Sequence, residues 1–411
     1  MSGTPSSSPE VGATKEGPLA GVRVIDVTTV FMGPSATQLL GDLGADVIKV
    51  ESPGGDSTRK LGPQGEQGMG PLFLGLNRNK RSIVLDLKTQ EGAEALLKLA
   101  ADADVLTYNV RPAAMKRLGL DYERVAKVNP GIIYAGMIGF SQRGRNAAMA
   151  AFDDLIQSAC ALPVAMAAGG AAPRYLPITI ADRSVGLYAF GVISAALYAR
   201  SRTGRGQSVE IPMFETMVPY VLGDHLYGQT FIPPQGGFGY PRIMSPNRRP
   251  YRTADGYVCC LVYTDKHWKT FLTAAGKPEL LKQDPRLRDI GTRTANIDAL
   301  YQFVADELLH KTTAEWQQQL AEADIPVFPM HDFDSLLEDE HLADIGFFRE
   351  VDHPAVGRIR DMAVPSEWSG TPPAAKARLA PTLGQHTDEL LAEVGYTPEQ
   401  IVAMRASGAA G

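Results

Sequence analysis

Short apolar runs alternate with longer amphipathic segments through the N-terminal third of the chain. VRVIDV (Val22–Val27) is short and rich in β-branched residues, a pattern typical of a buried strand. The next segment, SATQLLGDLGA, has a helical pattern, with Pro34 suited to a first turn. DVIKVE (Asp46–Glu51) is a second predicted strand. A strand, loop, helix and strand within about thirty residues predict a βαβ unit with a parallel sheet.

The same pattern recurs, so residues 18–140 are predicted to form an open α/β sheet of the Rossmann type. A helix is expected in TQEGAEALLKLAADA, and three further strands at Ser82–Leu87, Val105–Asn109 and Gly131–Phe140. Beyond the sheet, a strongly apolar helix is predicted to run from Asp182 to Arg200, and SVEI after it has the pattern of another strand.

The pattern changes after Asp224, where GQTFIPPQGGFGYPRIMSPNRRP is rich in Gly, Pro and Arg and has little periodicity. Such a stretch is typical of a linker or a mobile loop. YRTADGYVCCLVY then predicts a hairpin, and helical patterns follow, so we place a smaller α+β domain at residues 225–328. The large Rossmann-like domain is residues 17–224, and residues 329–411 are expected to return to it. Residues 1–16, rich in Ser, Gly and Pro, are expected to be a disordered lead-in.

Composition and charge narrow the possible partners. With 44% hydrophobic residues and a net charge of −6, the chain has the profile of a globular protein and lacks the basic surface that nucleic acid requires. The three cysteines, Cys160, Cys259 and Cys260, have neither disulfide-framework nor zinc-site spacing. No signal-peptide pattern is present, and the apolar stretch around Val185–Ala199 fits a buried helix better than a membrane span. We therefore expect a cytoplasmic protein with no metal, nucleic-acid or membrane partner.

Asp182 stands immediately before the apolar helix, in ITIADRSVG, and two roles fit this position. One is an N-cap, because an aspartate carboxylate there accepts hydrogen bonds from backbone N–H groups. The other is covalent catalysis, because a carboxylate at a helix N-terminus stays ionised and can attack a carbonyl carbon. The local pattern supports both roles.

The βαβ start suggests a dinucleotide site, with Glu51 where a ribose-binding acid would lie. However, the first loop reads TVFMGPSATQLLGDLG, and its glycines are spaced wrongly for a pyrophosphate turn. A serine hydrolase is also disfavoured, because no GxSxG elbow is present. His386, just before a predicted helix, is expected to be structural.

Basic residues cluster in NRNKRS, before the third predicted strand, and in NVRPAAMKRLG, after the fourth. Arg78, Lys80 and Arg117 are candidates for binding a phosphate-bearing cofactor, since Arg and Lys bind phosphate by charge-assisted hydrogen bonds. The alternative is that they are solvated surface charges.

Five segments taken together resemble the class III CoA-transferases, the CaiB/BaiF or formyl-CoA transferase-like family. They occur in the expected order from about Gly17 to Thr397: GPLAGVRVIDVTTVFMGPSATQLLGDLGADVIKVE, NRNKRSIVLDLKTQEG, ADVLTYNVRPAAMKRLGLDY with VNPGIIYAGMIGF, ADRSVGLYAFGVISAALYARSRTGRGQSVEIPMFE, and LGQHTDELL. One such segment alone would be weak evidence, whereas five in order are specific.

The resemblance implies a Rossmann-like large domain built from both ends of the chain, a small domain between them, and an interlocked homodimer. It places the catalytic aspartate at Asp182 and implies coenzyme A as co-substrate, with no metal or redox cofactor. The CoA contacts that it implies are Val30, Phe31, Met32, Asn109, Val110 and Arg117. The glycines Gly236, Gly237 and Gly239 match, loosely, the loop that covers the active site in formyl-CoA transferase.

Three departures from the family pattern bear on the reaction. Formyl-CoA transferases have glutamine where this chain has Phe31 and lysine where it has Ile138, so oxalate with formyl-CoA is a doubtful substrate pair. The α-methylacyl-CoA racemases share the fold but use a histidine in a GHD-like motif. This chain reads AFDD there, and Phe152 cannot transfer a proton, which disfavours racemisation.

We therefore expect a CoA-transferase that moves CoA from a succinyl-CoA-like donor to a carboxylic acid, preferably a small dicarboxylate. Arg242, Arg248 and Arg249, near the candidate lid, are candidates for holding the second carboxylate, with solvated loop charges as the alternative. The rival hypotheses are an acyl-CoA racemase or isomerase on the same fold, and a non-catalytic acyl-CoA-binding protein.

Overall fold

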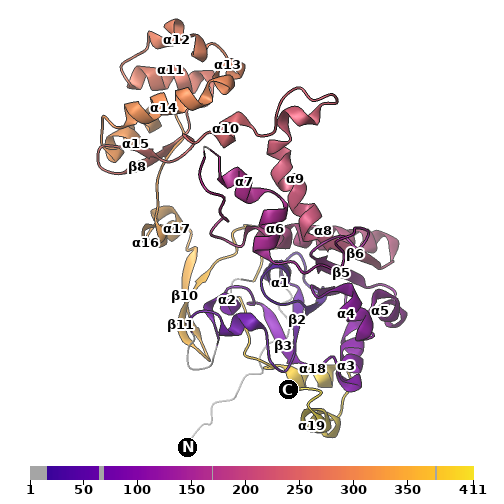
Figure 1. Ribbon diagram of the computed structural model, residues 1–411. Coiled ribbons are helices and arrows are strands. Elements are labelled where there is room, and N and C mark those ends of the chain that lie inside the picture. Colours follow the sequence, from indigo (N-terminus) through magenta and orange to yellow (C-terminus); the bar gives the residue numbers. More distant parts are fainter. Residues whose placement is uncertain (1–15, 64–68, 169, 375–376) are drawn as a thin grey trace, which may run out of the picture. The chain divides into compact units, whose positions relative to one another are not determined.

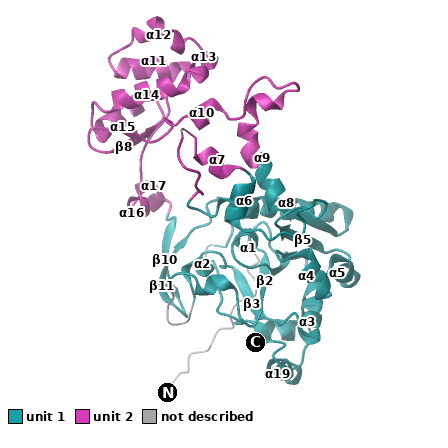
Figure 2. Ribbon diagram, viewed as in Figure 1, with its two compact units in different colours: residues 1–160, 177–218, 346–411 teal, residues 161–176, 219–345 magenta. Residues whose placement is uncertain are grey.

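The computed structural model describes residues 16–63, 69–168, 170–374 and 377–411. The predicted lead-in, residues 1–16, lies outside the described residues except for Glu16. The chain divides into two compact units, shown in Figure 2. Unit 1 comprises residues 1–160, 177–218 and 346–411, and unit 2 comprises residues 161–176 and 219–345.

Unit 1 is built on a six-stranded sheet in the order β3-β2-β1-β4-β5-β6, in which every neighbouring pair is parallel. Its strands are β1 (Arg23–Val27), β2 (Asp46–Glu51), β3 (Lys80–Val84), β4 (Val105–Tyr108), β5 (Ile133–Ile138) and β6 (Gln207–Pro212). The strand order reverses direction between β1 and β4, and open α/β sheets bind ligands at such a switch point. The α/β class and the Rossmann-like sheet are therefore confirmed.

Helices cover both faces of this sheet (Figure 1), and side chains that alternate along the strands are buried on each face. One face, which includes Ile25, Ile48 and Leu106, packs in one apolar core with α3, α4, α5, α18 and α19. The other face, which includes Val24 and Val47, packs against α1 and α8. These helices are α1 (Met32–Asp42), α3 (Gln90–Ala101), α4 (Pro112–Arg117), α5 (Tyr122–Val128), α8 (Ile180–Thr203), α18 (Thr387–Glu393) and α19 (Pro398–Ser407). Covering both faces is what an all-parallel sheet requires.

Helix α8 is longer than the sequence predicted and begins two residues earlier, at Ile180. By length and composition it is the one helix of the described residues that could cross a bilayer, although a core helix passes the same test. Its buried side, which includes Ala181, Val185 and Ile193, is that of a core helix. The prediction of a buried helix holds for that side only, because Leu187, Tyr188 and Tyr198 are exposed.

The C-terminal part of the chain, residues 346–411, belongs to unit 1. It contains the antiparallel pair β10 (Phe348–His353) and β11 (Gly357–Met362), followed by α18 and α19. The backbone N–H groups of Ser82 and Val84 in β3 donate to His386 Nδ1 and Thr387 Oγ1 at 3.1 Å each. His386 therefore has the structural contact expected of it, at the edge strand of the sheet.

Smaller elements complete unit 1. They are η1 (Ser57–Lys60), α2 (Pro71–Leu74) and α6 (Asp153–Ala159). Helix α6 contacts α8, and the two helices together carry the acidic residues described below.

Unit 2 has its own apolar core, centred on Trp268, Phe271 and Trp316. Its sheet joins β7 (Tyr251–Arg252), β8 (Tyr257–Cys260) and β9 (Val327–Pro329) in antiparallel pairs. Its helices are α7 (Leu162–Met166), η2 (Tyr227–Thr230), α10 (Pro241–Met244), α11 (Asp265–Ala274), α12 (Leu280–Gln283), η3 (Pro285–Leu287), α13 (Ile290–Ala295), α14 (Ile297–Leu308), α15 (Thr313–Glu322), α16 (Phe333–Leu337) and α17 (Glu340–Asp344).

Unit 2 is wider than the small domain placed at residues 225–328. It takes in residues 161–176, and it extends through α16 and α17 to Ile345. The division between the units also falls inside helix α9 (Met213–His225), next to Pro219. Sequence patterns locate domain boundaries at linkers, so a boundary inside a continuous helix gives no signal.

Candidate active site

Asp182 lies in the first turn of α8, where the helix dipole favours a negative charge. The N-cap position belongs to Thr179, which makes no side-chain capping bond. The N-cap interpretation of Asp182 is therefore wrong, because the helix starts upstream of it. The Asp182 carboxylate therefore does not cap α8, and the other predicted role, covalent catalysis, still fits its position.

A second acid, Asp153, supports the backbone of Asp182. Asp153 is buried at the start of α6, and its Oδ1 accepts a hydrogen bond from the Asp182 N–H at 2.9 Å. Its Oδ2 accepts one from Gln157 Nε2, a helical turn later, at 2.6 Å. The side chain of Asp153 is thus held on both oxygens while it fixes the start of α8.

The surroundings of Asp182 favour its protonated form. Burial raises its pKa, the nearby Asp153 carboxylate raises it further, and Arg183 opposes both, so that the pKa is about 7. An aspartate in water titrates near 4, so this group is strongly perturbed. At neutral pH both forms are present, and a carboxylate with such a pKa is a better nucleophile than an ordinary aspartate.

Arg183 and Phe31 connect this acid to the first loop of the sheet. The guanidinium carbon of Arg183 lies 5.8 Å from the centroid of the Phe31 ring, within the range of a cation–π contact. Phe31 immediately precedes α1, and α1 packs closely along α8. One side of unit 1 therefore brings together Phe31, Arg183 and Asp182.

The predicted CoA-contact loops meet at the switch point between β1 and β4. These strands pair directly, so the loops that follow them lie side by side. The N–H of Thr29 donates to Asn109 Oδ1 at 3.0 Å, and Asn109 Nδ2 donates to the Thr29 carbonyl at 2.8 Å. Asn109 thus joins the two loops, and Val110 beside it is exposed. Val30 has a positive φ of 71°, and Met32 is buried as the first residue of α1.

The remaining basic candidates lie in different surroundings. Arg117 is exposed in the last turn of α4, where a ligand phosphate can reach it. Arg78 is buried between Asp42 and Asp361, with a 2.7 Å contact to Asp42 Oδ2. Lys80 has no exposed surface, and its ammonium donates to Asp26, Asn77 and the Pro34 carbonyl at 2.9 to 3.0 Å. In this conformation Arg78 and Lys80 are occupied by the protein, which weighs against their predicted contact with CoA.

The glycines proposed as a lid lie in unit 2, in a loop that folds back on itself. The Gly228 N–H donates to the Gly237 carbonyl at 3.2 Å, and the Gly239 N–H donates to the His225 carbonyl at 2.9 Å. Gly239 has a φ of 94°, which a residue with a side chain rarely adopts. A Cβ on Gly228 would lie 2.5 Å from Gly236 Cα, so this crossing requires glycine.

The arginines Arg242, Arg248 and Arg249 also lie in unit 2. The guanidinium carbon of Arg242 lies 5.2 Å from the Tyr263 ring, and its Nε is buried without a partner among the described residues. Arg248 and Arg249 are exposed. Among the residues that the structure describes, no three His, Cys, Asp or Glu side chains gather in a way that could hold a metal ion.

Two residues of this site were missed in the sequence. Asp153 is the first aspartate after Phe152 in AFDD, and Phe152 itself is exposed at the N-cap of α6. Arg183 directly follows Asp182 in ADRSVG. Both stretches were considered, but the contacts of these two side chains depend on how α6, α8 and α1 pack, which no local pattern contains.

Comparisons with known proteins agree on one family. The model of CoA-transferase family III matches residues 19–387. The chain is 32% identical to succinyl-CoA:glutarate CoA-transferase of Mus musculus over 92% of this chain and 86% of that protein. It is 36% identical to acetyl-CoA:oxalate CoA-transferase of Acetobacter aceti over 78% of this chain and 82% of that protein. A solved CaiB/BaiF family protein from Brucella suis superposes with a TM-score of 0.77, at 29% identity, over 92% of this chain and 100% of its own.

Proposed function

The chain belongs to CoA-transferase family III and is an enzyme of that class, and from this premise we propose that it transfers CoA between carboxylic acids through a covalent intermediate on Asp182. The observation that carries this proposal is the environment of Asp182. Its carboxyl is partly buried in the first turn of α8 beside Asp153, and its pKa is about 7. A perturbed acid of this kind in a CoA-transferase is a candidate nucleophile on physical grounds.

The reaction proceeds by four acyl exchanges. A carboxylate oxygen of Asp182 attacks the donor thioester, the C–S bond breaks, and a mixed anhydride and CoA thiolate form. The thiolate attacks the aspartyl carbonyl and releases the donor acid, leaving an aspartyl-CoA thioester. The acceptor carboxylate attacks this thioester and releases the thiolate again, which then takes the acceptor acyl group and frees Asp182. Charge is conserved at each step, and no proton is consumed.

The burial of Asp182 suits these intermediates, because water would hydrolyse each of them. Arg183 acts on this carboxyl and lies against Phe31, which belongs to the first loop. Asn109 joins this loop to the one after β4, and we assign this side of unit 1 to acyl-CoA. Arg117, exposed at the end of α4, is proposed to meet a CoA phosphate.

For the acids, we propose a succinyl-CoA-like donor and a small dicarboxylate acceptor. Relatives that support this choice are named for glutarate and for mesaconate, both dicarboxylates, with succinyl-CoA as donor. Arg242, Arg248 and Arg249 remain the candidates for binding the second carboxylate, and Arg248 and Arg249 are exposed. Phe31 and Ile138, in place of a glutamine and a lysine, argue against oxalate with formyl-CoA.

We also propose that the enzyme is a homodimer, as the family resemblance implies. The exposed apolar side chains of α8, Leu187, Tyr188 and Tyr198, support self-association through this helix.

The test of the covalent step is trapping with hydroxylamine. Incubation with succinyl-CoA and hydroxylamine is expected to convert Asp182 to its hydroxamate, which mass spectrometry of the digested protein locates. Asp182→Ala is expected to lower the transfer rate on the order of a thousandfold or more while coenzyme A still binds. Transfer that survives this change would exclude the mechanism. Activity with monocarboxylates alone, in a panel of acceptor acids, would exclude the dicarboxylate preference.

The alternative of a racemase predicts a different result. An isomerase would exchange the α-hydrogen of an acyl-CoA with deuterium from solvent in the absence of any acceptor acid. Phe152, exposed at the position of the racemase histidine, gives no base for this exchange. A non-catalytic acyl-CoA-binding protein would show neither exchange nor a hydroxamate.

A further inference from the structure

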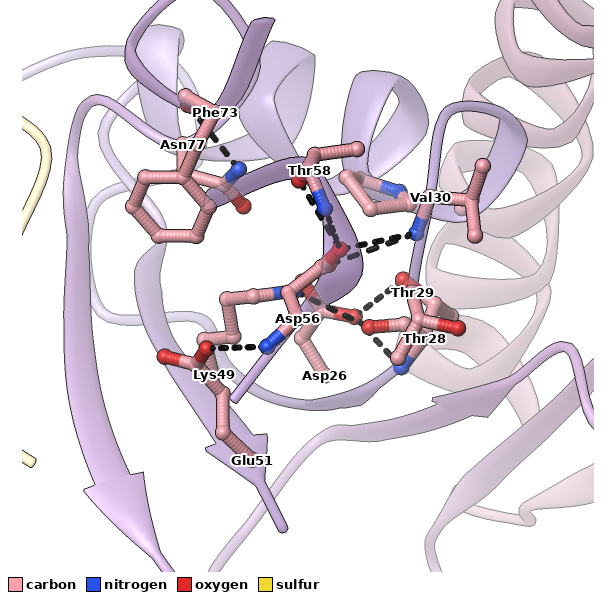
Figure 3. A network of polar contacts seen from close by, with 12 residues as sticks. Asp26, Thr28, Thr29, Val30, Lys49, Glu51, Asp56, Thr58, Phe73 and Asn77 are labelled. Carbon is pink, nitrogen blue, oxygen red and sulfur yellow. Dashed lines mark hydrogen bonds and ion pairs between the residues drawn. The ribbon is translucent and has the colours of Figure 1, made fainter. Parts of the chain in front are cut away.

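Three successive residues of the first loop are held at the backbone by side chains from three other segments. Figure 3 shows two of these side chains, Lys49 and Asp56, with the loop residues Thr28, Thr29 and Val30. The Thr28 carbonyl accepts a hydrogen bond from Lys49 Nζ at 3.0 Å. The side-chain amide of Asn109 bonds both the backbone N–H and the backbone carbonyl of Thr29. The Val30 N–H donates to the two Asp56 carboxylate oxygens at 3.3 and 3.4 Å. Loops are ordinarily the mobile part of a fold, whereas here each of three successive residues is held by a side chain. The conformation of this loop is therefore imposed on it.

Val30 is the residue that most needs this support. Its φ of 71° lies in the left-handed region, which β-branched residues avoid because of steric clash. Such a conformation persists only where the surroundings determine it, and it is commonly found where function requires it. The contact that fixes Val30 is the one to Asp56.

Asp56 and Lys49 form an ion pair that has no exposed side-chain surface. Lys49 Nζ lies 2.9 Å from Asp56 Oδ2, and Asp56 Oδ1 also accepts from the N–H and hydroxyl of Thr58 at 3.0 and 2.8 Å. Burial opposes charge on both groups. Lys49 nevertheless lowers the pKa of Asp56, and the carboxylates of Asp26 and then Asp56 raise the pKa of Lys49, so both stay ionised. A buried ion pair is an inefficient source of stability, and its best-attested use is to specify one geometry.

The geometry it specifies is that of Phe31, the next residue. The Phe31 ring lies against Arg183, the neighbour of Asp182, and α1 starts directly after it at Met32. We propose that Asp56, oriented by Lys49, is a positioning residue that holds Val30 in the left-handed conformation and thereby presents Phe31 and the start of α1 to acyl-CoA. The identity of the ligand rests on the proposed function, whereas the support of the loop does not.

The first test is the affinity for coenzyme A, measured by calorimetry on the full chain. Asp56→Asn keeps the size of the side chain but offers at most one acceptor oxygen, and Val30 is expected to relax. The dissociation constant for coenzyme A is then expected to rise about tenfold. Thr58→Val is the matched control, because it removes a bond to the same carboxylate without touching the loop. It is expected to lower the melting temperature and to leave the dissociation constant within about twofold.

A double-mutant cycle distinguishes a specific effect of Asp56 on the Val30 conformation from a general loss of structure. Glycine adopts a positive φ without strain, so a loop with Val30→Gly needs the Asp56 anchor less. In the Val30→Gly background, Asp56→Asn is expected to change the dissociation constant less than about twofold. A loss of the same size in both backgrounds, or an unchanged dissociation constant in Asp56→Asn alone, would overturn the positioning role.

Hydrogen exchange of the unmodified protein tests whether the Val30 amide is held by Asp56, even if the Asp56→Asn variant does not fold. Without ligand, the Val30 amide is expected to be as protected as the amides of β1, because its acceptor is buried. Exchange at the rate of an exposed loop would overturn the proposal. Absence of coenzyme A binding by the unmodified protein would instead contradict the proposed function, so the two failures are distinguishable.

Discussion

The backbone N–H of Asp182 donates to the side chain of Asp153 at 2.9 Å, so one acid lies against another at the start of α8. Because Gln157 holds the second oxygen of Asp153, the Asp153 carboxylate cannot turn away. Its negative charge remains beside Asp182 and adds to the effect of burial on the pKa of that residue. The contact thus fixes the position of the proposed nucleophile and tunes its ionisation at the same time.

The transfer rate should depend on pH through Asp182. Only the ionised form attacks a thioester, and its pKa is about 7 because burial and Asp153 favour the protonated form. We expect kcat/KM to rise as the pH passes through neutrality and to level off above it. Initial rates with succinyl-CoA across this range measure the midpoint. A profile that is flat through neutral pH would contradict an essential carboxylate with this pKa.

Replacing Asp153 by asparagine should lower that midpoint. The asparagine carbonyl still accepts from the Asp182 N–H, and Gln157 can present its own oxygen to the new amide, so the geometry is retained while the charge is lost. Loss of a neighbouring negative charge stabilises ionised Asp182. The midpoint of the pH–rate profile is the readout. Asp154→Asn, at an exposed neighbour on the same helix, serves as control and should leave the midpoint in place.

Arg183→Gln should move the same midpoint in the opposite direction. The guanidinium favours the charged form of Asp182, and its removal raises the pKa of that carboxyl. Affinity for acyl-CoA should also fall by a small factor, because the contact with Phe31 is lost. A downward or absent shift of the midpoint would show that Arg183 does not act on Asp182.

Much of the sheet could be predicted from the sequence, and the reasons are physical. A parallel sheet buried on both faces needs short β-branched strands, and Val22–Val27, Asp46–Glu51 and Val105–Asn109 match β1, β2 and β4 within a residue. The third strand begins two residues, and ends three residues, before the predicted Ser82–Leu87. It begins at Lys80, because Lys80 and Arg81 are buried against acidic partners, whereas a local pattern assigns such charges to a surface.

The candidate site was predictable only as far as local features extend. Asp182 was found through its position before an apolar helix and through the family resemblance, and Asn109 through the resemblance alone. The bond from Asp153 to Asp182 and that from Asp56 to Val30 join residues 29 and 26 positions apart. These contacts depend on tertiary packing, so no periodicity or motif in the sequence predicts them.

The ionised carboxylate of Asp182 should lower the free energy of unfolding at and above neutral pH, where the proposed nucleophile is active. Its pKa is raised from the ordinary aspartate value of 3.8 to about 7 in the fold, so between these values the folded protein binds a proton that the unfolded chain does not. Stability therefore falls as the pH rises between these two values, and the penalty is fully present above about 7. Above neutral pH we expect Asp182→Asn to be more stable than the unmodified protein, with an unfolding free energy larger by on the order of a few kcal/mol. Its melting temperature should be higher accordingly. This advantage should shrink as the pH is lowered toward 4; an advantage that grows instead would contradict a raised pKa.

The close packing of α1 on α8 should be sensitive to a single methyl group. A Cβ on Gly186 of α8 would lie 2.2 Å from Ser35 Oγ and 2.8 Å from the Met32 carbonyl oxygen, and the second contact is to backbone. Gly186→Ala must therefore push apart the helix that carries Asp182 and the helix that follows Phe31. We expect a loss of about 1–3 kcal/mol in unfolding free energy and a fall in transfer rate larger than the loss of stability explains. Gly191→Ala, in the same helix with nothing within 4 Å, is the matched control and should be neutral or stabilise the fold by up to about 1 kcal/mol. Denaturant unfolding and initial rates of both variants make the comparison, and equal behaviour of the two would show that this crossing does not position the site.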